Sequence, residues 1–133
     1  MNRHVETAVL DSQGLSAWIS QERKLLTMVQ AFHRMGTDLV VSANTIVEVS
    51  HARVSMPRLQ WTLSRVRVEP VTERAAREAA RLLKDAGLHG HKYAIDATVA
   101  EAALRQPGPV AVLTSDVDDM TRLCGHRAQI IGV

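Results

Sequence analysis

The sequence predicts one α/β domain over residues 1–133, with helices on both faces of a central, mainly parallel five-stranded sheet. Two observations support this fold class. Short apolar segments alternate with longer segments of helical periodicity along the whole chain. The length of 133 residues also suits a single hydrophobic core, with little left over for a second.

The predicted strands are short apolar runs bounded by polar, glycine or proline residues. Runs of this kind occupy residues 5–10, 39–41, 66–68, 110–113 and 130–133. Asp11 closes the first run, and Thr114-Ser115-Asp116 closes the fourth. Because helical segments separate the runs, neighbouring strands are expected to be parallel.

The clearest helix spans residues 73–86, with Thr72 as its N-cap and Gly87 as its stop. A second covers residues 93–105, and residues 88–92 are expected to form a loop before it. The other helical segments are residues 15–35 (broken near Ser20-Gln21 and ended at Gly36), the segment of Glu48 capped by Ser42 or Asn44, one starting near Pro57, and residues 120–124.

The composition predicts a cytoplasmic protein without membrane contact. No apolar run approaches the roughly 20 residues that span a bilayer. The apolar stretch after Met1–Glu6 is also too short for a signal peptide. Cys124 is the single cysteine, which excludes a disulfide or a thiolate zinc cluster within one chain, and it is expected to pack in the core.

Thirteen of the sixteen basic residues are arginine, which suits bidentate contact with phosphate. The net charge of +2 does not by itself require a nucleic-acid partner. The few aromatic residues cannot form a base-stacking platform, and Trp18 and Trp61 are expected to serve packing or a dimer interface. His51 and Arg53 are either exposed or in contact with RNA, and His89 and His91 are interpreted as surface residues.

Four acidic residues, Asp11, Glu48, Asp96 and Asp116, follow or flank the predicted strands. Asp11 and Asp116 follow the first and fourth strands, and Glu48 lies one turn into the helix after the second. Asp96 interrupts an apolar segment in the expected first turn of its helix, where the helix dipole favours the anion. Ligands bind at the carboxyl ends of parallel strands, so all four acids are expected at one edge. Each alone has a simpler explanation, such as a cap, a turn, or an ion pair of Glu48 with Arg53.

Four carboxylates at one edge would repel one another, and a divalent cation would relieve that repulsion. Hard oxygen ligands select Mg²⁺, or the similar Mn²⁺, and such a site can activate water against a phosphodiester. One or two ions are compatible with the sequence. Asp119 is the second choice for the position given to Asp116, and Asp118 is expected to face solvent or to cap the short helix.

The chain resembles the PIN domain, specifically the small VapC-type toxins of bacterial type II toxin–antitoxin pairs. The resemblance rests on the segments Val9-Leu10-Asp11-Ser12, Ser42 to Glu48, Ile95-Asp96-Ala97 and Leu113-Thr114-Ser115-Asp116. It implies a three-layer α/β/α fold, Mg²⁺-dependent endoribonuclease activity on tRNA or mRNA, a homodimer and inhibition by a cognate antitoxin. It also implies that the metal-site acids are Asp11, Glu48, Asp96 and Asp116, that Asp119 is an extra acid, and that Ser12 and Thr114 are supporting hydroxyls. Gln13-Gly14 departs from the small or polar residues usual after the first aspartate.

Two other functions share features with this sequence. One is another acidic-site α/β phosphohydrolase, but Gln13 stands where a dehalogenase-like phosphatase needs a second aspartate. A phosphoryl receiver would require a lysine after its last strand, and none is placed there. The other is a catalytically inactive PIN-like module that binds RNA or protein, which loss of one of the acids would have favoured. The sequence leaves open the cleaved RNA and the identity of the antitoxin.

Overall fold

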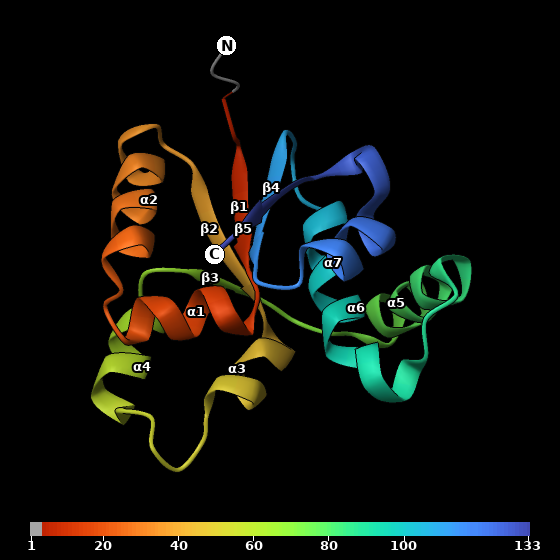
Figure 1. Cartoon of the computed structure of the whole chain (residues 1–133), viewed down its shortest axis with the longest axis horizontal. Coiled ribbons are helices and arrows are strands. Elements are labelled where there is room, and N and C mark those ends of the chain that lie inside the picture. Colours follow the sequence, from red (N-terminus) through yellow and green to blue (C-terminus); the bar gives the residue numbers. More distant parts are fainter. Residues whose placement is uncertain (1–3) are drawn as a thin grey trace.

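Five parallel strands form the central sheet of the protein, in the order β3-β2-β1-β4-β5 (Figure 1). The computed structural model describes residues 4–133, so part of the N-terminal segment interpreted above lies outside the described residues. The strands are β1 (Thr7–Leu10), β2 (Asp38–Ser42), β3 (Arg67–Glu69), β4 (Val110–Thr114) and β5 (Gln129–Gly132). The expected sheet is confirmed, and all of its strand pairs are parallel.

Helices cover both faces of this sheet, which gives three layers (Figure 1). One face is covered by α1 (Ser12–Ile19), α2 (Arg23–Arg34) and α4 (Met56–Leu63). The opposite face is covered by α5 (Glu73–Ala86), α6 (Gly90–Leu104) and α7 (Val117–Cys124), the last followed by a short 3₁₀ turn, η1 (Gly125–Arg127). Helix α3 (Ala43–Val49) contacts both α1 and α6 near the carboxyl ends of the strands.

The central strands are buried on both sides, which explains their unbroken apolar sequences. Leu10 and Leu113 pack into the core beneath α1, α2 and α4, whereas Val9 and Val112 pack into the core beneath α5, α6 and α7. All four side chains are inaccessible to solvent. The two-residue alternation of a strand therefore supplies two separate cores from the same short segments.

Local signals set most of the helix boundaries. Gln21 takes a left-handed backbone conformation and separates α1 from α2 at the predicted break. Thr72 caps α5 by accepting a hydrogen bond from the Ala75 N–H at 3.1 Å. Gly87 ends α5 with φ +68°, a conformation that glycine adopts without steric cost. Both ends of α5 agree with the prediction.

The loop predicted over residues 88–92 is wrong. The Leu88 N–H closes the end of α5 on the Leu83 carbonyl at 3.0 Å, and α6 begins at Gly90. Glycine at a first helical position disturbs little, because its N–H has no partner within the helix in any case. Among residues 4–133, no helix has the length and apolar character needed to cross a membrane.

Candidate active site

The candidate site lies where the strand order reverses, between β1 and β4. These strands are neighbours in the sheet but are separated by most of the chain. The loops after them diverge into α1 and α7, which leaves an opening at their carboxyl ends. Helices α1, α3 and α6 converge at this end of the sheet, in the lower part of Figure 1.

The two carboxylate oxygens of Asp11 have different surroundings. Its Oδ1 accepts a hydrogen bond from the Gly14 N–H at 3.0 Å, so the side chain caps α1. Its Oδ2 is buried and has no hydrogen-bond partner among the described residues, and the residue as a whole is 1% exposed. Burial raises the pKa of the Asp11 carboxyl and the charge of Asp116 adds to this rise, whereas the Thr114 side chain and the Gly14 N–H oppose part of it. An unpartnered buried carboxylate oxygen is costly, so it calls for a ligand.

A cleft of about 380 Å³ opens beside Asp11. It brings together the other predicted acids, which are Glu48 from α3, Asp96 from α6, and Asp116 and Asp119 from the start of α7. Its other polar lining residues are Ser12, Gln13, His91, Lys92 and Tyr93. Asp118 is exposed, as predicted, and does not line the cleft.

The pKa of Asp96 is shifted by its burial and by the other acids of the site. Burial and neighbouring negative charges raise its pKa from 3.8 to about 6. The contributing charges are those of Asp116, Asp11, Glu48 and Asp119. The expected help from a helix dipole is wrong, because α6 begins at Gly90 and Asp96 therefore lies in the second turn. The dipole effect fades within the first turn, whereas the surrounding carboxylates remain.

The predicted hydroxyl residues hold the loops of the site. Thr114 is fully buried, and its Oγ1 accepts a hydrogen bond from the Asp116 N–H at 2.9 Å. Ser12 donates to Gln13 Oε1 at 3.2 Å. A Cβ atom on Gly14 would lie 3.2 Å from the Leu113 carbonyl oxygen. The close approach of α1 to β4 therefore explains the glycine in the unusual Gln13-Gly14 pair.

The donor set fits a hard divalent cation. Among residues 4–133, no group of three or more His, Cys, Asp or Glu side chains is arranged to hold a metal ion as the side chains stand. The acids nevertheless supply only oxygen donors, they repel one another, and Asp11 Oδ2 has no other partner. Glu48 and Asp116 are exposed, so their carboxylates have room to rotate toward such an ion.

Sequence reasoning missed the contribution of His91 and Lys92 to the cleft, because both were placed in a loop. In the structure they lie in the first turn of α6, and Lys92 is four residues before Asp96. That spacing, which places two residues on one face of a helix, was the signal available in the sequence. Glu48 forms no ion pair with Arg53 among the described residues, so that simpler explanation of Glu48 is wrong.

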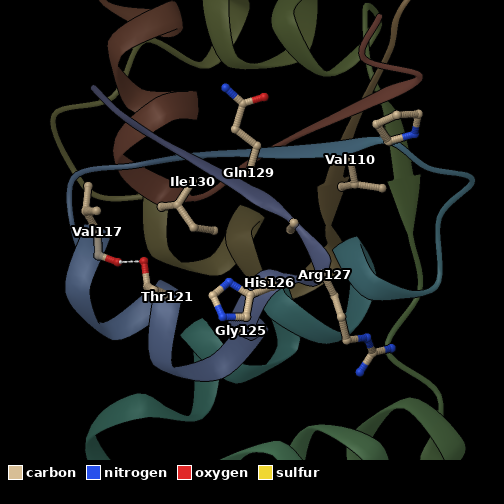
Figure 2. Close-up of a pocket in the computed structure, with 10 residues that line it drawn as sticks. Val110, Val117, Thr121, Gly125, His126, Arg127, Gln129 and Ile130 are labelled. Atoms are coloured by element: carbon tan, nitrogen blue, oxygen red, sulfur yellow. Dashed lines mark hydrogen bonds between the residues drawn. The ribbon is translucent and has the colours of Figure 1, made fainter. Parts of the chain in front are cut away.

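A second cleft, of about 410 Å³, lies between α7 and β5 (Figure 2). Its lining includes Val117, Thr121, His126 and Ile130, and no carboxylate is among the described residues that form it. Figure 2 shows Val117 and Ile130 presenting aliphatic side chains there. This cleft lacks acidic oxygen donors and is not a candidate for metal-dependent chemistry.

Two solved structures share this fold over nearly their whole length. One is the crystal structure of VapBC2 from Rickettsia felis bound to a DNA fragment from their promoter, with a TM-score of 0.73, 13% identity, and coverage of 96% of this chain and 98% of that one. The other is the structure of FitAB bound to the IR36 DNA fragment, with a TM-score of 0.67, 16% identity, and 94% of each chain covered. No curated protein sequence matches this chain.

The family itself is identified from sequence. A PIN domain family model matches residues 8–125, which include all of β1 but Thr7, the whole of β4 and every acid of the cleft. The match therefore covers most of the chain together with the whole candidate site. The protein belongs to the PIN domain family.

Proposed function

We propose that this chain is a metal-dependent endoribonuclease that acts as the toxin of a bacterial toxin–antitoxin pair. PIN domains are generally nucleases, which supports hydrolysis of phosphodiesters. The observation that carries the proposal is the cleft at the switch point, which Glu48, Asp96, Asp116 and Asp119 line next to Asp11 with its buried, unpartnered Oδ2.

The acids of the cleft have distinct tasks in this proposal. Asp11, Glu48, Asp96 and Asp116 would hold Mg²⁺ or Mn²⁺, with Asp119 as a further ligand or the alternative to Asp116. An ion held there would supply a water of lowered pKa and positive charge against the phosphate. Capping of α1 through Oδ1 fixes the Asp11 carboxylate, so that Oδ2 keeps its place. Thr114 fixes the backbone from which Asp116 projects.

The biological role rests on the structural neighbours. VapBC2 and FitAB are toxin–antitoxin complexes bound to DNA, and both cover nearly all of this chain. By analogy, we propose a cytoplasmic homodimer inhibited by its own antitoxin, with tRNA or mRNA as substrate.

Incubation of purified protein with labelled tRNA and mRNA, in Mg²⁺ and in EDTA, tests the activity. The Asp96→Asn variant should lose cleavage, whereas Asp118→Asn, which removes a nearby exposed acid outside the cleft, should retain it. Cleavage that persists in EDTA and in Asp96→Asn would overturn the metal mechanism. RNA binding without cleavage in Mg²⁺ would favour the non-catalytic module instead.

Induced expression in a bacterial host tests the toxin role separately. Growth should stop with the wild-type chain and continue with Asp96→Asn at equal protein levels. Normal growth with an active wild-type enzyme would identify a nuclease that is not a toxin.

A further inference from the structure

Lys92 stands out among the residues that line the acidic cleft. It is the one lysine or arginine of the described lining, and the rest of the charged lining is acidic apart from His91. Lys92 and Asp96 are four residues apart on α6, so they share a face of that helix. The two therefore present opposite charges to the same space.

Lys92 is not used to hold the fold together. Within the described residues it makes no salt bridge with the acids of the cleft, and its Nζ lies over the Tyr93 ring, 5.2 Å from the ring centre. A lysine placed N-terminal to an acid is also the less favourable order for a helical ion pair. Stability of α6 thus gives no reason for a lysine at this position.

We infer that Lys92 binds a phosphate of the RNA strand next to the cleavage site, an assignment that rests on the proposed function. The acids of the cleft carry more negative charge than one divalent ion neutralises, so an approaching phosphodiester meets repulsion. An ammonium group on a flexible stem supplies the missing positive charge at the mouth of the cleft. The contact is to the backbone and is independent of base sequence.

The binding arm of the test uses protein that does not cleave. A fluorescein-labelled single-stranded RNA is titrated in EDTA against Asp96→Asn, Asp96→Asn/Lys92→Ala and Asp96→Asn/Lys84→Ala, over a range of salt concentrations. Lys84 is an exposed lysine of α5 outside the cleft, so it controls for the loss of one positive charge. Loss of one phosphate contact should reduce the slope of log K against log salt by about 0.7. If the variants bind equally at 1 M salt, the Lys92→Ala double variant should then bind roughly fivefold more weakly at 0.1 M salt.

The kinetic arm uses the active protein in Mg²⁺. Lys92→Ala should raise KM about fivefold with a smaller change in kcat, Lys92→Arg should restore KM, and Lys84→Ala should match wild type. A merely structural lysine would instead lower the melting temperature in EDTA while leaving RNA affinity unchanged, and that result overturns the inference. So does equal behaviour of Lys92→Ala and Lys84→Ala in both arms.

The two arms separate this inference from the proposed function. If wild-type protein cleaves RNA but Lys92→Ala behaves like Lys84→Ala, the nuclease assignment stands and the role of Lys92 falls. If wild-type protein cleaves no RNA while Lys92→Ala still flattens the salt dependence, the catalytic proposal falls and the phosphate contact of Lys92 stands.

Discussion

Replacing Asp96 with asparagine measures the repulsion within the acidic cleft. Asparagine keeps the shape of the side chain but removes its charge. The pKa of Asp96 rises from 3.8 to about 6, first through burial and then through the surrounding carboxylates. Since one pKa unit corresponds to about 1.4 kcal/mol, ionised Asp96 lowers the free energy of unfolding of metal-free protein by at most roughly 3 kcal/mol, because solvent screens the half-buried carboxylate.

The sign of the effect fixes its pH dependence. The folded protein binds the Asp96 proton more tightly than the unfolded chain does, so stability is lost as the pH rises from about 4 to about 6. Below that window the residue is neutral in both states and contributes nothing. Above it the full cost is present. Asp96→Asn should therefore be more stable than wild type by up to roughly 3 kcal/mol at pH 7 to 8, and equal to it near pH 3.5.

Urea denaturation followed by circular dichroism, in EDTA and at several pH values, measures this difference. Asp118→Asn removes an exposed acid of α7 that does not line the cleft, and it should change the free energy of unfolding by less than about 0.5 kcal/mol. Added Mg²⁺ should stabilise wild type more than Asp96→Asn. A destabilised Asp96→Asn variant, or a gain that is the same at pH 4 and pH 8, would refute the account of charge repulsion.

Three further predictions concern individual residues. Asp11→Asn should abolish RNA cleavage but keep the cap of α1 through its amide oxygen, whereas Asp11→Ala should also lose about 1 kcal/mol of stability; equal unfolding curves for the two variants would contradict the capping role. Gly14→Ala should lower the free energy of unfolding by about 1 kcal/mol, because its Cβ would lie 3.2 Å from the Leu113 carbonyl oxygen, and calorimetry showing a stabilised protein would count against this contact. Burial raises the pKa of the Cys124 thiol to about 11, so a disulfide reagent at pH 8 should label it slowly in native protein and rapidly in urea; fast native labelling would mean that the thiol is accessible.

The elements of the fold could be predicted where the sequence carries a local signal. The helix from Glu73 to Ala86 has a threonine cap and a glycine stop, and the structure reproduces both ends. The apolar run before Asp11 likewise became a fully buried strand. These signals act over a few residues and depend little on the rest of the chain.

The start of α6 could not be predicted in the same way. Gly90 and the two histidines around it resemble a loop, and the apolar positions that mark the helix begin only at Tyr93. Tertiary context decides this boundary, because α5 ends at Gly87 and leaves little chain before α6 must begin. The predicted start at Tyr93 placed Asp96 in the first turn of the helix instead of the second. It also left Lys92 outside the helix, so the face that Lys92 shares with Asp96 was not recognised.

The meeting of the acids depends on strand order, which single residues do not encode. Asp11 and Asp116 become neighbours because β1 pairs with β4, and no local pattern specifies that pairing. The rule that parallel strands bind ligands at their carboxyl ends was enough to place them at one edge. It did not reveal which oxygens would be satisfied, and the free Oδ2 of Asp11 emerges only from the packed structure.

The acidic cleft lowers the stability of this small fold. Asp11 keeps one buried oxygen without a partner, and Asp96 is held ionised at neutral pH against the charges around it. A sequence shaped by stability alone would place amides or apolar groups at these positions, since uncompensated buried charge is among the most destabilising features of proteins. Two hydrogen bonds nevertheless fix the surrounding loops: the Gly14 N–H donates to Asp11 Oδ1, and the Asp116 N–H donates to Thr114 Oγ1. Rigid support around a destabilising cluster is the arrangement expected when the cluster exists to bind a cation.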